Sequence, residues 1–292
     1  MKIQESFDAY LAHVLKYRSR GTYLYYRKNY NVMMPMLEDL GYIHCYQIDE
    51  LIFENLIDYF LAKTTKKHSK INDAISCVIT ALNFSSIKYP KRYKLKDDTE
   101  SFRALSDEEL NALLAYVKKM NCSVTNNLAW ALSICLFLDT GVRLSELLDI
   151  RFKNIDLDNN MISLDHTKNG QKRIVFFDEL SKDLLLKARK KKTEYVIYNY
   201  EKGTQLNKRS LEHFFDKMNR DLKTDVKIHA HRLRKTFATR LLRKGCPLTT
   251  ISKLLGHKDI RQTMIYLQID QVMLAKDYKE FYPYRKKEKE QN

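Results

Sequence analysis

The fold of this chain is decided by one stretch near its C-terminus, His231-Arg232-Leu233-Arg234-Lys235-Thr236-Phe237-Ala238-Thr239. It leads through Leu254-Leu255-Gly256-His257 to Tyr266, nine residues after the histidine. Earlier in the chain, Thr140-Gly141-Val142-Arg143-Leu144-Ser145-Glu146-Leu147 supplies another arginine in a helix–turn context. Guanidinium groups match the oxygens of a phosphodiester and stabilise the charge that builds up when its phosphorus is attacked. Two arginines, two histidines and a tyrosine are therefore the parts needed to hold a phosphodiester and attack it with a phenol.

The composition predicts a helix-rich chain of two domains that binds a polyanion. Its 292 residues exceed one average domain, and a hydrophobic content of 44% is sufficient for real cores. Only 7 Gly and 4 Pro indicate few tight turns. The net charge of +16 lies mostly in the later part, since residues 1–100 hold 15 Lys and Arg against 12 Asp and Glu, and the other 192 hold 37 against 24. Such a field favours salt-sensitive binding of nucleic acid.

Several kinds of site are not expected from the sequence. The 5 cysteines are scattered, odd in number and never arranged as C-x-x-C, so we expect free thiols rather than disulfides or a zinc site. We expect neither a metal nor another cofactor, because no carboxylate cluster and no Gly-rich phosphate loop is present. No apolar run has membrane-spanning length and no signal peptide begins the chain, so we expect a cytoplasmic protein with no membrane partner.

Hydrophobic periodicity predicts the domain organisation. Residues 1–90 carry four helical patterns, the first through Phe7, Leu11, Val14 and Leu15, and are expected to form a small helical bundle. Proline and mixed charge break the pattern in residues 91–104, the predicted linker. A second domain is expected over 105–283, followed by a disordered tail over 284–292. The first helix of this second domain has a predicted capping box made by Ser106 and Glu109.

Inside the second domain the spacing of apolar residues changes from one typical of helices to one typical of strands, and then back. Residues Leu128–Leu138 are strongly apolar, which predicts a buried helix leading to Arg143. Met161–Leu164 and Arg173–Phe177 flank Asn169-Gly170, a pair typical of hairpin turns, so we expect a β-hairpin with Lys168 beside its turn. Later residues return to a helical pattern, except for a possible short strand over Tyr195–Tyr198.

The order of these motifs resembles the tyrosine recombinase (phage integrase) family, in particular its simple two-domain members of Xer or resolvase type. The motifs cover residues 101–275, whereas the first hundred residues match only in size and helical character. The resemblance implies a mainly α fold with a small β-sheet. It also implies an N-terminal helical core-binding (SAM-like) domain and a catalytic domain, which together form a C-shaped clamp on duplex DNA.

The resemblance also implies roles for the motif residues. Arg143 and Arg234 would clamp the scissile phosphate, and Tyr266 would attack it to give a 3′-phosphotyrosine and a 5′-hydroxyl. His231 would act as a general acid/base or orienting group, a role that suits imidazole near neutral pH. His229 and Arg232 also fit the pattern His-x-x-Arg. The block that begins at Leu233 matches the family's sequence after this motif, so the resemblance assigns the roles to His231 and Arg234.

Three further site residues follow from the same comparison. His257 would donate a hydrogen bond to the phosphate, and Glu146 would orient its neighbours without acting as an acid. Lys168 would protonate the leaving 5′-oxygen; Lys172 is its competitor, but the family's lysine stands five residues before the hairpin arginine, here Arg173. Basic residues outside this set are expected to contact DNA, namely Lys66, Lys67, Lys70, Lys172, Arg173, Arg232 and Lys235.

The function implied is site-specific DNA recombination: integration, excision, or resolution of dimers or cointegrates. Four protomers would assemble on two inverted-repeat sites and exchange strands through a Holliday junction. An amphipathic helix over residues 270–281 would dock on a neighbouring protomer, or else pack within its own chain. The alternatives are strand relaxation by a type IB topoisomerase-like enzyme and a non-catalytic architectural DNA-binding protein.

Overall fold

The computed structural model describes residues 1–91, 94–96, 103–123, 125–165, 172–257 and 259–266. The chain divides into two compact units, Met1–Ser101 and Phe102–Asn292, and the division falls inside the predicted linker. The predicted helix over 270–281 and the predicted tail over 284–292 lie outside the described residues. In the ranges described, no helix is both long enough and apolar enough to cross a membrane.

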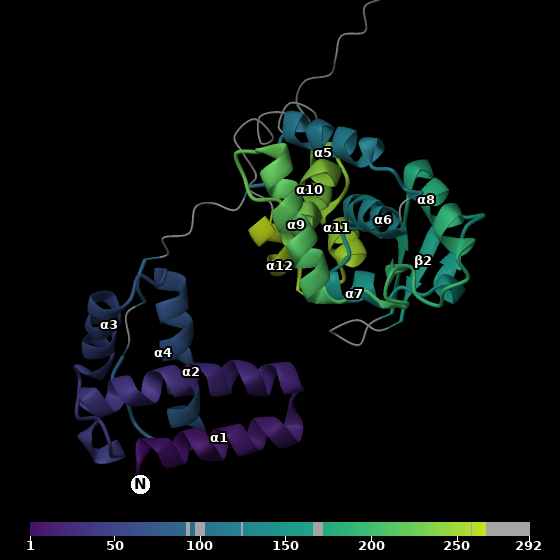
Figure 1. Cartoon of the computed structure of the whole chain (residues 1–292). Helices are drawn as coiled ribbons and strands as arrows, with labels where there is room; N and C mark the ends of the chain where they lie inside the picture. Colours follow the sequence, from purple (N-terminus) through teal and green to yellow (C-terminus); the bar gives the residue numbers. More distant parts are fainter. Residues whose placement is uncertain (92–93, 97–102, 124, 166–171, 258, 267–292) are drawn as a thin grey trace, which may run out of the picture. The chain divides into compact units, whose positions relative to one another are not determined.

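The first unit is a bundle of helices, as predicted. Helices α1 and α2 lie side by side, and α4 packs against both of them (Figure 1). Gly41, at a φ of +84°, lies just after the end of α2 and acts as the helix stop. The buried core includes Phe7 and Val14, but Leu15, on the same predicted stripe, is 64% exposed. The elements are α1 (Ile3–Tyr17), α2 (Arg20–Asp39), the 3-10 turn η1 (Cys45–Gln47), α3 (Ile52–Lys63) and α4 (His68–Phe84).

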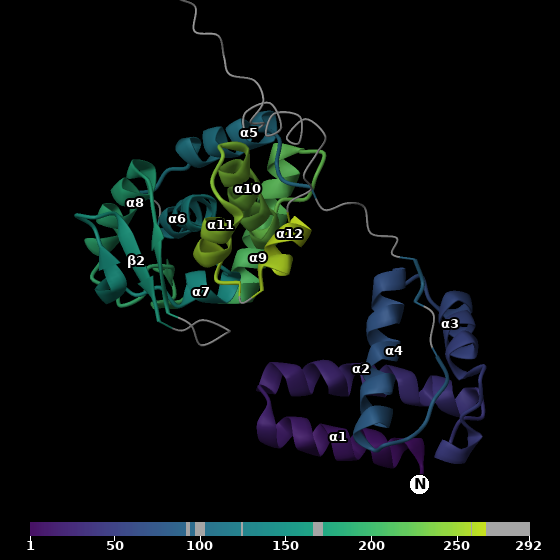
Figure 2. The same ribbon diagram turned by 180° about the vertical axis from the view of Figure 1, so that it is seen from behind.

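The second unit is built around one buried helix, α6 (Thr125–Thr140), which confirms the predicted apolar helix. Figures 1 and 2 show α6 in the middle of this unit, with α8 on one side and α10 on the other. The predicted capping box is present at the start of α5, where Ser106 and Glu109 bond each other's backbone N–H groups. The remaining helices are α5 (Asp107–Lys119), α7 (Leu144–Leu148), the 3-10 turn η2 (Phe152–Asn154), α8 (Glu179–Arg189), α9 (Lys208–Leu222), α10 (Ala230–Arg243), α11 (Leu248–Leu255) and α12 (Ile260–Tyr266).

A small antiparallel sheet contains the predicted hairpin strands in the order β1-β2-β3. Its strands are β1 (Ile155–Asp156), β2 (Met161–Leu164) and β3 (Arg173–Phe176), so the last strand ends one residue earlier than predicted. Leu164 pairs with Arg173, and Ile162 pairs with Val175. Leu164, Ile162 and Val175 are buried, so Arg173 begins β3 on the buried face of the sheet. The predicted turn and Lys168 lie outside the described residues.

The shortest strands differ from the prediction. The predicted strand over Tyr195–Tyr198 overlaps β4 (Tyr198–Asn199) only at its last residue, and Tyr195 makes an isolated bridge to Arg151. Strands β1 and β5 (Thr204–Gln205) are not predicted at all. Two residues cannot show the alternation from which a strand is recognised, so these elements depend on their partners rather than on their own sequence.

Candidate active site

The turn after α6 places the first site arginine. Gly141 has a φ of +60°, and a Cβ at this position would overlap the ring of Phe237, lying 2.8 Å from Cε1. The two segments therefore approach closely here, because only glycine fits this space and this backbone conformation. The carbonyl oxygen of Gly141 accepts a hydrogen bond from Nη1 of Arg234 at 2.6 Å. The turn thus connects the segment before Arg143 directly to the second site arginine.

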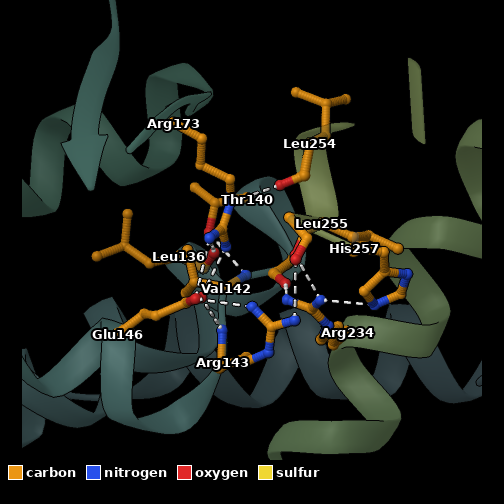
Figure 3. Close-up of polar contacts among 12 residues, drawn as sticks. Leu136, Thr140, Val142, Arg143, Glu146, Arg173, Arg234, Leu254, Leu255 and His257 are labelled. Carbon is orange, nitrogen blue, oxygen red and sulfur yellow. Dashed lines mark hydrogen bonds and ion pairs between the residues drawn. The ribbon is translucent and has the colours of Figure 1, made fainter. Parts of the chain in front are cut away.

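Glu146 is a buried carboxylate that binds two arginines (Figure 3). Its Oε2 accepts from the backbone N–H of Arg143 at 2.7 Å, and its Oε1 accepts from Nη1 of the same residue at 2.9 Å. Arg173 contacts both oxygens, through Nη1 at 2.9 Å and Nη2 at 2.6 Å. Burial alone would raise the pKa of Glu146, but the hydrogen bonds from Arg173 and from the backbone of Arg143 outweigh it and lower the pKa to about 2.

Helix α11 ends in a Schellman motif at Gly256, whose φ is +66°. The N–H of Gly256 donates to the carbonyl of Lys253 at 3.0 Å, and the N–H of His257 donates to the carbonyl of Ser252 at 3.0 Å. These two bonds satisfy two of the carbonyls that a helix end leaves without a partner. The following three carbonyls are satisfied in another way.

Each of those three carbonyls accepts a hydrogen bond from a different arginine (Figure 3). The C-terminal end of a helix carries partial negative charge, so it attracts guanidinium groups without neutralising them. Three positive charges are thus gathered around one helix end, and the carboxylate of Glu146 binds two of them. The pairs are Arg173 Nε with Leu254 at 2.9 Å, Arg234 Nη2 with Leu255 at 2.6 Å, and Arg143 Nη2 with Gly256 at 3.1 Å.

His257 is held by hydrogen bonds at both ring nitrogens. Its Nε2 lies 3.0 Å from Nη2 of Arg234, and its Nδ1 lies 2.7 Å from Oγ1 of Thr263. Arginine can only donate, so Nε2 accepts, and the neutral ring carries its proton on Nδ1. Burial, followed by the positive charges of Arg234 and Arg143, lowers the pKa of His257 to about 4. In the free protein this ring is neutral and accepts a hydrogen bond at the nitrogen that faces the arginine.

His231 lies one turn before Arg234 on α10. With Arg143 and Arg234, it lines a cleft of about 840 Å³, so the structure brings these three predicted residues together. The His231 side chain is exposed, but partial desolvation and the charges of Arg234 and Arg143 lower its pKa. A neutral imidazole beside two guanidiniums can accept a proton from an attacking hydroxyl group.

Tyr266 is the last residue of α12, and its side chain lies outside the described part of the chain. Thr263, the partner of His257, is fully buried one turn earlier on the same helix. Sequence reasoning missed Thr263. Its position three residues before Tyr266 was an available signal, because side chains with that spacing lie on one face of a helix.

The residues predicted to contact DNA differ in their exposure. Lys172 is 80% exposed and pairs with Asp165 at 3.6 Å. Arg173 is 8% exposed, Lys235 is 5% exposed, and Nη1 of Arg232 donates to the carbonyl of Arg103 at 2.9 Å. The side chains of Arg173 and Lys235 are too little exposed in this structure to fit the DNA contacts predicted for them. Lys66, Lys67 and Lys70 are exposed in the first unit.

The five cysteines are free thiols, as expected. Within the described ranges, no group of three or more His, Cys, Asp or Glu could hold a metal ion.

Comparison with known proteins gives the family. The model of the phage integrase family matches residues 103–272, more than half of the chain. The chain belongs to the phage integrase family. Among its relatives are integrases and tyrosine recombinases, which places it among enzymes that cleave and rejoin DNA.

Individual members of the phage integrase family match over different lengths. A probable integrase/recombinase of Acholeplasma phage L2 is 28% identical over 267 residues, which cover 87% of this chain and 90% of that protein. The tyrosine recombinase XerA of Saccharolobus solfataricus is 45% identical over 139 residues, but the match covers 47% of this chain and only 45% of that protein. The structure of the Tn1549 transposon integrase with circular intermediate DNA matches with a TM-score of 0.76 and 18% identity, covering 97% of this chain and all of that one. This last match supports the mainly α fold with a small sheet.

Proposed function

We propose that this phage integrase family member is a site-specific recombinase that cuts and rejoins DNA through a covalent 3′-phosphotyrosine. The observation that carries the proposal is the cleft where Arg143, His231 and Arg234 meet. Both arginines are held by carbonyl oxygens at the end of α11 and keep their positive charge. Such a cleft suits an anionic phosphodiester and the further charge of its transition state.

Cleavage would be a transesterification at phosphorus. The phenolic oxygen of Tyr266 attacks, a new O–P bond forms to the 3′-phosphate, and the bond from phosphorus to the 5′-oxygen breaks. His231 takes the phenolic proton, and Lys168 gives a proton to the leaving 5′-oxygen. Arg143 and Arg234 hold the non-bridging oxygens. The reverse attack by a 5′-hydroxyl group restores the DNA strand, so no energy source is needed.

His257 would join this site only after a change in its hydrogen bonding. Its Nε2 accepts from Arg234 in the free protein, so it cannot donate to a phosphate in that state. A phosphate beside the ring raises the pKa of His257, because a negative charge favours the imidazolium form. With a second proton, Nε2 becomes a donor toward the phosphate oxygen while Thr263 still binds Nδ1.

The larger assembly is also proposed. Residues 1–90 and 105–283 would close around duplex DNA as a C-shaped clamp joined by the linker over 91–104. Four protomers on two inverted-repeat sites would exchange strands through a Holliday junction in the cytoplasm, with the helix over 270–281 docked on a neighbour. The DNA-bound integrase of Tn1549 has the same fold, which supports a DNA partner.

The test is trapping of a covalent protein–DNA adduct. The probe is a nicked duplex whose inverted repeats have been selected by the protein from a random pool. We expect a denaturant-resistant adduct with the wild type and with the control variant Tyr284→Phe, whose tyrosine lies in the predicted tail. We expect none with Tyr266→Phe, which should still bind the duplex. An adduct with Tyr266→Phe would refute this nucleophile. Plasmids with one or two sites then separate recombination from topoisomerase-like relaxation, because only recombination joins sequences from two sites.

A further inference from the structure

Arg173 was expected on the DNA surface, but it lies inside the second unit. Its side chain is 8% exposed and projects from the first residue of β3 onto the buried face of the sheet. The terminal nitrogens contact the two oxygens of Glu146, and Nε donates to the carbonyl of Leu254 at 2.9 Å. The guanidinium also packs against Gly256, where a Cβ would lie 2.8 Å from Nη1.

These contacts connect three segments that carry site residues (Figure 3). The first is β3, at the end of the hairpin that carries Lys168. The second is the start of α7, where Glu146 holds both the backbone and the side chain of Arg143. The third is the end of α11, immediately before His257. Arg173 itself is not among the residues that line the cleft.

We propose that Arg173 is a positioning residue, which fixes Glu146, and through it Arg143, against the end of α11 that precedes His257. The proposal rests on the function proposed above. The guanidinium of Arg173 presents a separate nitrogen to each of the two carboxylate oxygens and to the backbone carbonyl, whereas a lysine ammonium would have to direct all three of its donors from one nitrogen. Without Arg173, Glu146 would lose its two hydrogen bonds from that side chain, and the guanidinium of Arg143 would turn further toward the carboxylate and away from the phosphate.

The second unit offers a matched control in Arg103, which binds both oxygens of Glu109 at 2.6 and 2.8 Å. We would compare Arg173→Met and Arg173→Lys with Arg103→Met and Arg103→Lys in single-turnover adduct formation at saturating DNA. We expect the rate to fall roughly 100-fold in Arg173→Met and less in Arg173→Lys, since misplaced catalytic groups cost about this much. DNA affinity should change little, and both Arg103 variants should cleave at close to the wild-type rate. A wild-type cleavage rate in Arg173→Met overturns the proposal.

A pH profile separates positioning from a general loss of structure. Without Arg173, Glu146 stays buried but loses the hydrogen bonds and the positive charge that lower its pKa most. The pKa of Glu146 should therefore rise from about 2 toward the pH range of the assay. The adduct rate of Arg173→Met should therefore fall as the pH drops from about 7 to 5. That additional fall should be absent in the wild type and in the double variant Glu146→Gln/Arg173→Met. If the single and double variants have the same profile, Arg173 does not act through Glu146.

Hydrogen exchange in the free protein tests the same role without activity. Peptides over residues 142–147 and 252–257 should exchange faster in Arg173→Met than in the wild type, and should be unaffected in Arg103→Met. Unchanged exchange in both peptides overturns the proposal. If the wild type forms no adduct, the recombinase function fails, and this exchange comparison still decides the role of Arg173.

Discussion

The ring of Phe237 fills the space beside Gly141 that any larger residue would need for its side chain. Phe237 lies on α10, one turn after Arg234, and Gly141 lies two residues before Arg143. One close contact thus sets the approach of the two segments that bring the clamping arginines together.

Replacement of Gly141 by alanine should therefore be costly. We expect Gly141→Ala to lower the free energy of unfolding by about 2–4 kcal/mol, the combined cost of a positive φ and of overpacking. Gly245→Ala is the control, because Gly245 has a φ of +84° and no atoms within 4 Å of the added Cβ. It should cost only about 1–2 kcal/mol in urea denaturation. Equal losses in the two variants would show that Phe237 can move aside.

Glu146 should stabilise the fold in a pH-dependent way. Its pKa is lowered to about 2, so its contribution is present above the ordinary glutamate value and is lost as the pH falls toward 2. The difference in unfolding free energy between wild type and Glu146→Gln should shrink by about 2 kcal/mol from pH 6 to pH 3. Denaturant titrations at four pH values would measure it. A difference that does not vary with pH would contradict the lowered pKa.

His257 should also make the free energy of unfolding depend on pH, because the folded protein favours the neutral form of its ring. Its folded pKa is about 4, so below the ordinary histidine value the unfolded chain binds a proton that the folded protein does not. The stability advantage of wild type over His257→Asn should fall by about 1–2 kcal/mol as the pH drops from 7 to 4.5, allowing for solvent screening. His229, whose pKa is also lowered to about 4, is present in both proteins and cancels. An advantage that grows toward low pH would show that the ring is charged when folded.

Thr263 should fix the tautomer of His257. In the wild type, nitrogen-15 NMR should show the proton on Nδ1, because Nε2 accepts from Arg234 and Nδ1 faces Thr263. Thr263→Val removes the hydroxyl group, so we expect a mixture of tautomers and roughly tenfold slower adduct formation, the size of one lost hydrogen bond. Thr263→Ser keeps the hydroxyl group and should restore both properties. A wild-type spectrum for Thr263→Val would assign the tautomer to Arg234 alone.

Much of the fold could be predicted because its signals are local. The buried helix α6, the capping box at Ser106 and the stop at Gly41 depend on residues within one or two turns of each other. The grouping of Arg143, His231 and Arg234 came from the order of motifs, which the family match supports. Leu15 fitted its helical stripe but is exposed, because periodicity cannot show where a stripe extends past its partner helices.

The role of Arg173 could not be predicted in the same way, because its partners are distant in sequence. Glu146 lies 27 positions earlier and Leu254 lies 81 positions later. A positive residue in a basic protein suggested DNA, yet Arg173 and Val175 fall on the same face of β3 by simple alternation. That alternation indicated burial, but only the folded chain shows which groups compensate the charge.

The gathering of guanidiniums at the end of α11 has a thermodynamic consequence. Like charges held within one small volume repel each other, and backbone oxygens moderate that repulsion without removing it. A polyanion that enters the cleft relieves it, so part of the binding energy of the nucleic acid is stored beforehand in the unliganded protein. The phosphates of the DNA would offset the repulsion among the guanidinium groups. DNA binding should therefore raise the melting temperature of the protein most strongly at low ionic strength, where salt screens this interaction least.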